Sequence, residues 1–130
     1  KKSKYKFHDL VQSFKPLGFL DYVYLQLNSK TVLSDSGSIT EESSILNFPA
    51  VNIRDVHERP EGMEEGAVIF TGMSTNEILR AINIALSQSS NGKRNINLVN
   101  DYSSNNVSEK VLRIIHSYTH YVNRVVWKKV

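Results

Sequence analysis

The chain has 130 residues, of which 40% are hydrophobic and 22% charged, and this composition suits one globular domain with a buried core. The absence of cysteine excludes disulfides, thiol chemistry and cysteine-ligated metals and fits a cytoplasmic protein, and no apolar run is long enough to cross a bilayer. Much of the net charge of +3 lies at the two ends of the chain and forms no basic stripe interleaved with aromatic residues, so we expect neither a nucleic-acid nor a membrane partner.

The first half of the chain predicts alternating helices and strands. Residues 18–28 are expected to form a helix with apolar side chains on more than one face, as in a helix partly buried in a cleft. The run 31–33 predicts a strand that stops in a tight polar turn, and 38–46 predicts a short helix. A second strand is expected at 49–53.

The second half continues this alternation. After a charged loop, residues 67–70 predict a third strand and 74–87 a helix, and a long final helix is expected at 107–127. The polar stretches 87–95 and 101–106 are typical of loops. The order of elements predicts an α/β fold with a parallel sheet flanked by helices. Three strands are few for such a sheet, so we expect the first strand–helix units of the domain to lie upstream.

Three of the predicted helices start with the same pair of residue types, a serine or asparagine and then a glutamate three positions later. In a capping box these two side chains satisfy backbone N–H groups that have no partner within the helix. We therefore expect capping boxes formed by Ser38 with Glu41, Ser74 with Glu77, and Asn106 with Glu109.

The segment most informative about function is 33–42, where the first strand turns directly into a helix. Such a turn presents backbone N–H groups at the positive end of the helix dipole, which suits a phosphate or diphosphate. Ser36 can add a hydroxyl donor, and Gly37 lets the backbone approach the anion. Ligands usually bind at this end of a strand in an open α/β sheet. A purely structural corner is the alternative, because strand–turn–helix corners are common.

Two adjacent glutamates follow this turn, and they are expected to have different roles. Glu41 lies three residues after Ser38, so we expect it to complete the capping box. Glu42 points about 100° away around the helix and is free to accept hydrogen bonds from a diol such as a ribose. The alternative for Glu42 is an exposed carboxylate that complements the helix dipole.

Several segments resemble the C-terminal domain of the non-hydrolysing UDP-N-acetylglucosamine 2-epimerases. They are Ser-Asp-Ser-Gly-Ser-Ile-Thr-Glu-Glu at 34–42, Phe-Pro-Ala-Val at 48–51 and Arg-Asp-Val-His-Glu-Arg-Pro-Glu at 54–61. Within that family, one branch makes UDP-N-acetyl-L-fucosamine by inverting C2 of UDP-2-acetamido-2,6-dideoxy-L-talose. The stretches that are similar to this branch are 57–65, 101–102, 106–111 and 121–128.

The resemblance implies both a fold and a reaction. Residues 1–130 would form part of the C-terminal, UDP-binding, Rossmann-like domain of a two-domain enzyme of the glycosyltransferase-B shape, with 107–127 as a long C-terminal helix. The implied reaction is C2 epimerisation of a UDP-2-acetamidohexose by elimination and re-addition of UDP, with no cofactor and no metal. The acid/base residues of the family lie upstream, so no catalytic residue is expected here. The intact enzyme would be a homodimer that acts on a UDP-sugar for bacterial surface polysaccharides.

The resemblance also assigns roles to individual residues of the turn. Ser36 and the backbone amides of Gly37 and Ser38 match the diphosphate loop of the family, which often has glycine at the position of Ser38. Glu42 matches the glutamate that binds the ribose hydroxyls. We therefore expect the diphosphate and the ribose of UDP to lie side by side at this helix start.

Three further residues are placed near the nucleotide by the same resemblance. Arg59 matches an arginine that can pair with phosphate oxygens, and its alternative is a surface ion pair with Glu58 or Glu61. Tyr22 matches an aromatic residue beside the uracil, with core packing as its alternative. For His57, a sugar contact and an ordinary surface histidine are both open.

Other candidate sites and functions carry less weight. His116 and His120 are spaced to reach one metal ion, but no third ligand is evident, so we expect no metal site. Glu64, Glu65 and Asp21 are expected to be solvated charges rather than paired catalytic carboxylates. The alternative functions are a glycosyltransferase of the same overall shape and a non-catalytic module that binds a nucleotide sugar.

Overall fold

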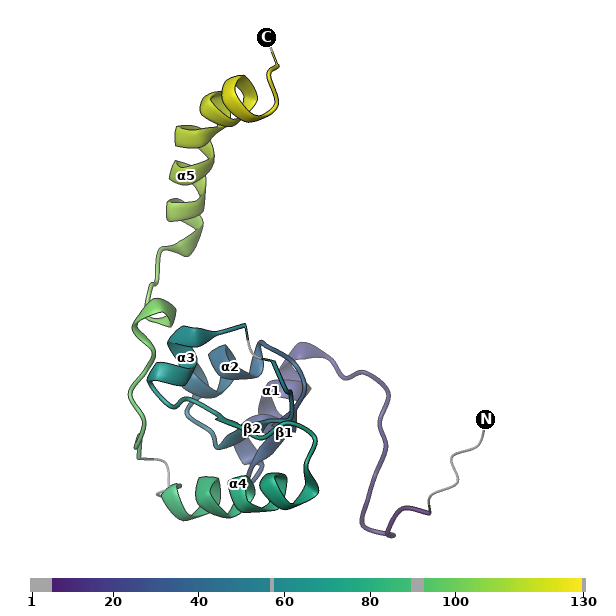
Figure 1. The fold of residues 1–130 in the computed structure, drawn as a ribbon. Helices are drawn as coiled ribbons and strands as arrows, with labels where there is room; N and C mark the ends of the chain where they lie inside the picture. Colours follow the sequence, from purple (N-terminus) through teal and green to yellow (C-terminus); the bar gives the residue numbers. More distant parts are fainter. Residues whose placement is uncertain (1–5, 57, 90–92, 130) are drawn as a thin grey trace.

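A computed structural model describes residues 6–56, 58–89 and 93–129 (Figure 1). Every predicted helix and strand is present, with bounds that differ from the prediction by a few residues. In chain order the elements are α1 (Phe19–Asn28), β1 (Val32–Ser34), α2 (Ile39–Leu46), β2 (Ala50–Asn52), α3 (Pro60–Glu64), β3 (Ile69–Phe70), α4 (Thr75–Gln88), the 3-10 helix η1 (Asn100–Tyr102), α5 (Val107–Tyr121) and the π-helix η2 (Val122–Val126).

The strands of the described residues form one parallel sheet in the order β1-β2-β3. Ser34 lies opposite Asn52, and Asn52 lies opposite Phe70, so the carboxyl ends of all three strands meet at one edge. The predicted α/β class, a parallel sheet flanked by helices, is confirmed. The sheet edge matters for function because side chains that follow different strands are brought together there.

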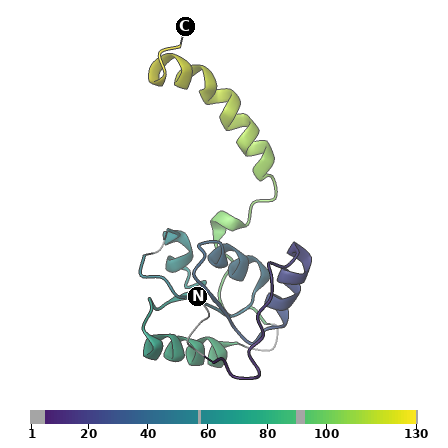
Figure 2. The same cartoon turned by 90° about the vertical axis from the view of Figure 1, so that its right-hand side faces the viewer.

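The two faces of the sheet pack against different helices. Ala50 and Val68 pack with Ile39 of α2 and with Phe48 in one buried cluster. The neighbouring Val51 points to the other face and packs with alanines of α4. This alternation along β2 is the two-residue period of a strand, and it places the core on both sides of the sheet. Figures 1 and 2 show α2 and α4 on opposite sides of the strands.

Helix α3 lies in the stretch that we expected to be a charged loop. Pro60 occupies its first turn, where a missing N–H group costs nothing. Gly62 is buried, and a Cβ atom on it would overlap the Cγ2 atom of Thr40 on α2. The five-residue helix therefore owes its position to close packing against α2, a contact between segments that are distant in sequence.

The three helices that we expected to begin with capping boxes begin at the predicted residues, but the capping boxes are absent. No side-chain capping hydrogen bond is present at Ser38, Ser74 or Asn106. The glutamates that would complete two of the boxes are engaged elsewhere, because Glu41 pairs with Arg59 and Glu77 with Arg80. The prediction of helix starts is confirmed and the prediction of capping boxes is wrong.

The C-terminal helix projects away from the α/β body (Figures 1 and 2). The predicted single helix at 107–127 is instead α5 followed by the π-helix η2. No residue of α5 is buried, and its apolar side chains are exposed, including Ile114, Tyr118 and Trp127 just beyond η2. Within the described part of the chain, no helix is both long and apolar enough to span a membrane.

Helix α1 also differs from its prediction. We expected apolar residues to bury it partly in a cleft, but Phe19 and Leu20 are 78% and 79% exposed. The buried residue of this helix is polar, since Gln26 is 3% exposed. Hydrogen bonds from Tyr22 and Gln26 to Glu42 connect α1 to α2, and these contacts lie beside the candidate site.

Candidate functional site

The turn between β1 and α2 is held in shape by its own side chains. The amide of Ser36 donates to Ser34 Oγ at 3.1 Å, and the amide of Ser38 donates to Ser36 Oγ at 3.3 Å. The two hydroxyl groups of Ser36 and Ser38 lie 3.0 Å apart. The buried side chain of Asn52, at the end of β2, donates to the carbonyl oxygen of Ser36 at 3.0 Å. The expected diphosphate loop is thus an ordered turn at the carboxyl edge of the sheet.

This turn keeps donors at the start of α2. Among the described residues, no hydrogen bond is formed by the amides of Gly37 and Ile39, as is usual for the first turn of a helix. These amides lie at the positive end of the helix dipole. The turn can therefore bind an anion through its backbone and, once it rotates, through the hydroxyl group of Ser36.

Glu42 is the centre of the polar contacts around this helix start. Its Oε1 atom accepts a hydrogen bond from Ser38 Oγ at 2.8 Å. Its Oε2 atom accepts from Gln26 Nε2 at 2.5 Å and from the Tyr22 hydroxyl at 3.1 Å, both on α1. The carboxylate thus bridges α1 and the turn. The alternative of an exposed carboxylate that only complements the helix dipole does not fit, because Glu42 is half-buried and both of its oxygens accept side-chain hydrogen bonds.

Tyr22 reaches the site through its hydroxyl group. The residue is 38% exposed, so the core-packing alternative for Tyr22 is wrong. Burial and then the hydrogen bond to Glu42 raise the pKa of the Tyr22 phenol above its ordinary value. The phenol therefore stays protonated and donates to the carboxylate at neutral pH. Its expected contact with a uracil base stays a prediction.

Arg59 lies on the other side of α2 and is paired with the first of the two glutamates. Its Nε atom donates to Glu41 Oε1 at 2.6 Å, and its Nη1 atom donates to the backbone carbonyl of Glu58 at 3.1 Å. The hydrogen bond to Glu41 raises the pKa of Arg59. The alternative ion pair with the carboxylate of Glu58 or Glu61 is wrong, because the observed partner is Glu41. The predicted phosphate contact of Arg59 stays a prediction.

Arg54 is a second cation at this edge, and the sequence reasoning missed it. It lies two residues after the end of β2, and its Nη1 atom would lie 3.8 Å from a Cβ atom placed on Gly37. Its ion pair is with the exposed Glu58 carboxylate at a long 3.4 Å. The guanidinium group of Arg54 is therefore held more loosely than that of Arg59 and lies closer to the turn. The available signal was its position two residues after the central strand.

Tyr102 extends the same polar network from the far end of the chain. Its hydroxyl donates to Glu61 Oε1 at 2.8 Å, which ties η1 to α3. Burial, followed by this hydrogen bond, raises the pKa of Tyr102. The pKa of Glu61 is lowered, first by a backbone hydrogen bond and then by Tyr102. The expectation that 101–106 is entirely loop is wrong, because η1 docks here.

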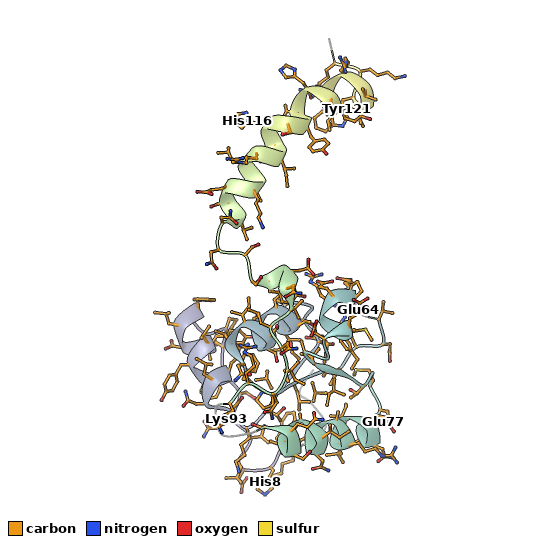
Figure 3. All side chains as sticks on the ribbon, turned by 90° about the vertical axis from the view of Figure 1, so that its left-hand side faces the viewer. His8, Glu64, Glu77, Lys93, His116 and Tyr121 are labelled. Atoms are coloured by element: carbon orange, nitrogen blue, oxygen red, sulfur yellow. The ribbon has the colours of Figure 1, made fainter. Side chains whose placement is uncertain are left out.

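The remaining candidate residues do not join the site. His57 lies outside the described residues. His116 and His120 are exposed on α5, far from the body, as Figure 3 shows for His116. Among the residues that the structure describes, no group of three or more histidine, aspartate or glutamate side chains could hold a metal ion. Glu64 and Glu65 are exposed, in agreement with the prediction of solvated charges.

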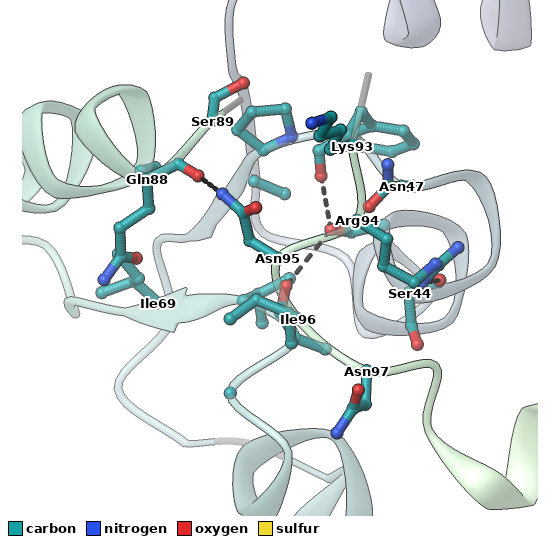
Figure 4. Close-up of a pocket in the computed structure, with 18 residues that line it drawn as sticks. Ser44, Asn47, Ile69, Gln88, Ser89, Lys93, Arg94, Asn95, Ile96 and Asn97 are labelled. Carbon is teal, nitrogen blue, oxygen red and sulfur yellow. Dashed lines mark hydrogen bonds between the residues drawn. The ribbon is translucent and has the colours of Figure 1, made fainter. Parts of the chain in front are cut away.

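A cavity of about 100 Å³ lies at the opposite edge of the sheet (Figure 4). It is lined by the end of α2, the end of α4 and residues 93–97. Arg94 lies in its wall and donates to the carbonyl of Ser44 at 2.6 Å, where a cation also complements the negative end of α2. Typical ligand pockets have about 300–1,000 Å³, so this cavity is too small for a sugar nucleotide.

Comparisons with known proteins agree with the fold and the resemblance. Residues 2–116 match the family model described as UDP-N-acetylglucosamine 2-epimerase. A UDP-N-acetylglucosamine 2-epimerase of Methanocaldococcus jannaschii is 32% identical over 112 residues, which are 86% of this chain and 29% of that protein. The structure of the UDP-N-acetylglucosamine 2-epimerase from Rickettsia bellii has a TM-score of 0.80 at 50% identity and covers 89% of this chain and 32% of that one.

A third relative was solved with a ligand. The UDP-GlcNAc 2-epimerase of Neisseria meningitidis bound to UDP-GlcNAc has a TM-score of 0.56 at 28% identity, covering 80% of this chain and 28% of that one. The chain belongs to the UDP-N-acetylglucosamine 2-epimerase family, and its sheet and helices form part of a glycosyltransferase-B-type architecture. The chain spans about 29% of the length of the first curated relatives that it matches.

Proposed function

We propose that this chain is the UDP-binding part of a two-domain enzyme that inverts C2 of a UDP-2-acetamidohexose. The observation that carries the proposal is the series of hydrogen bonds that connects Ser36, Ser38, Glu42 and Tyr22 around the start of α2. These residues combine anion donors with a carboxylate acceptor, which is the combination that a diphosphate next to a ribose requires. Family membership supports the same conclusion.

We assign each part of UDP to residues of this arrangement. The hydroxyl group of Ser36 and the backbone amides of Gly37 and Ser38 donate to diphosphate oxygens at the helix start. Arg59 supplies a guanidinium group for the same oxygens. Glu42 accepts hydrogen bonds from the ribose hydroxyls, and the ring of Tyr22 contacts the uracil.

The reaction places a specific demand on these residues. As a base removes the C2 proton of the sugar, the C1–O bond breaks and the diphosphate leaves with the electron pair, forming a C1–C2 double bond. The diphosphate oxygen then adds back to C1 while a proton is delivered to C2 from the opposite face. Electrons balance without a redox cofactor, and no metal is assigned a role. Donors that stabilise the departing diphosphate and keep it close lower the barrier in both directions.

The proton-transfer groups are assigned to the part of the enzyme outside this chain. We assign the substrate to the UDP-2-acetamidohexoses, with UDP-2-acetamido-2,6-dideoxy-L-talose and its C2 epimer UDP-N-acetyl-L-fucosamine as the preferred pair. UDP-N-acetylglucosamine and its C2 epimer form the second candidate pair. Supporting this class, the Neisseria meningitidis relative was solved bound to UDP-GlcNAc. We place the whole protein in the cytoplasm as a homodimer that supplies bacterial surface polysaccharide synthesis.

Solvent isotope exchange tests the reaction directly. The whole protein, incubated with the UDP-sugar in deuterated water without added nicotinamide or metal, should place deuterium at C2 of the product. Mass spectrometry and proton NMR measure the incorporation. A product formed without deuterium at C2 would refute the elimination mechanism. The 130-residue chain alone should show no turnover but should bind UDP, and turnover by this chain would refute the assignment of proton transfer to another domain.

A further inference from the structure

The side chain of Gln26 contacts the site from beneath the exposed surface of α1. Gln26 is 3% exposed and is the buried residue of this helix. Its Nε2 atom donates to Glu42 Oε2 at 2.5 Å, and its Oε1 atom is buried without a hydrogen-bond partner among the described residues. A carboxylate can only accept, so the NH2 end of the amide must face Glu42.

Burial of an amide that makes one hydrogen bond is an unfavourable way to dock a helix. An apolar side chain at position 26 would pack α1 against α2 without leaving a buried oxygen unpaired. Most of the apolar side chains of α1, including Phe19, Leu20 and Leu25, are exposed. The amide of Gln26 is therefore better explained by what it does to Glu42 than by docking alone.

The partners of Glu42 differ in how firmly they hold it. Gln26 is buried and close, whereas Tyr22 is exposed and makes a longer bond of 3.1 Å to the same Oε2 atom. The Oε2 atom of Glu42 already accepts two hydrogen bonds. The Oε1 atom accepts only one, from Ser38, so it retains a lone pair for a further donor. Gln26 thus turns Oε2 toward α1 and leaves Oε1 on the side of the diphosphate turn.

We propose that Gln26 is a positioning residue that fixes the Glu42 carboxylate so that its Oε1 atom accepts the ribose hydroxyl next to the diphosphate. This inference rests on the proposed function, because it assumes that Glu42 binds the ribose. Gln26 itself does not touch the nucleotide. Its loss should therefore weaken recognition of the ribose and leave recognition of the diphosphate in place.

The test compares UDP with 2′-deoxy-UDP on the whole protein carrying Gln26→Met, a variant of similar length without the amide. Titration calorimetry should show that UDP binds about two- to tenfold more weakly than to the wild type, the range expected for one hydrogen bond. The affinity for 2′-deoxy-UDP should hardly change, so the preference for UDP over the deoxynucleotide should shrink. An equal loss for both nucleotides, or no loss for either, would overturn the positioning role.

Two controls separate positioning from docking. Asn28→Ala removes the side-chain bond to the carbonyl of Tyr24 within α1 and does not touch Glu42, so the preference for UDP should be unchanged. The exchange Gln26→Glu with Glu42→Gln rebuilds the hydrogen bond in reverse and leaves the amide oxygen of position 42 on the side of the turn, so it should recover part of the preference for UDP that Gln26→Met loses. An exchanged protein with no more preference than Gln26→Met would refute the inference. A wild type that binds UDP and 2′-deoxy-UDP equally would instead overturn the assigned role of Glu42. A wild type that binds neither nucleotide would overturn the proposed function.

Discussion

The two adjacent glutamates of α2 should respond differently to replacement by alanine. Glu42→Ala removes the acceptor of three side-chain hydrogen bonds, from Tyr22, Gln26 and Ser38. Tyr22 is exposed and its hydroxyl can bond to water instead, but the buried amide of Gln26 loses its partner. An unsatisfied buried donor costs about 1–3 kcal/mol, so the free energy of unfolding should fall by about that amount and the melting temperature by several degrees.

The same variant should also lose affinity for UDP. A charged acceptor of ribose hydroxyls contributes about 1.5–3 kcal/mol to binding. Its loss should raise the dissociation constant for UDP roughly tenfold to hundredfold. Glu42→Gln is the matched control, because its side-chain oxygen can still accept from Gln26 while the charge is lost. This control should keep most of the stability and lose much of the UDP affinity.

Glu41→Ala should have a smaller effect on stability and little effect on binding. The lost contact is the ion pair with Arg59, whose side chain is 34% exposed and whose partner is 31% exposed, so water screens it. Removing Glu41 also frees the Arg59 guanidinium, so UDP affinity should be kept or increased. Denaturant unfolding and titration calorimetry on both variants measure the two quantities. If Glu41→Ala proves to be the less stable variant and the weaker binder, the assignment of roles around this helix start is wrong.

Three further changes test other contacts of the structure. Gly37→Ala should leave thermal stability nearly unchanged, because the added methyl group meets its nearest neighbour at an ordinary 3.8 Å. The same change should weaken UDP binding by obstructing the turn, and an affinity equal to that of the wild type would argue against an anion at this position. Gly62→Ala should destabilise the protein by about 1–3 kcal/mol in thermal unfolding through overlap with Thr40, and a stabilised variant would show that α3 packs differently. The pKa of Glu61 is lowered in the folded state, so its contribution to stability is present above the ordinary glutamate pKa and is lost as the pH falls through the lowered value. Tyr102→Phe removes one cause of the lowered pKa and should therefore unfold at a higher pH than the wild type in an acid titration. Superimposable titration curves would contradict the hydrogen bond between Tyr102 and Glu61.

The sequence by itself determined the local features of this protein. The start of α2 at Ser38, the polar turn before it and the alternation of strands and helices were all predicted, and each depends on residues within a few positions of one another. The spacing of hydrophobic residues and the residue types at a helix start are local patterns along the chain, so the elements that they predict can be recognised without knowledge of the fold. The resemblance to the epimerase family was likewise carried by short contiguous segments, and the family match confirmed it.

Only the tertiary structure decided which partner each polar side chain takes. The capping role predicted for Glu41 was locally reasonable, but Arg59, 18 positions away, binds that carboxylate. The contact between Gln26 and Glu42 spans 16 positions, and α3 is held by packing on Thr40 rather than by a strong helical pattern. A charged or amide side chain has several possible partners of similar intrinsic strength, and burial and distance in the folded chain select among them. That selection is made between elements, so no local pattern in the sequence reveals it.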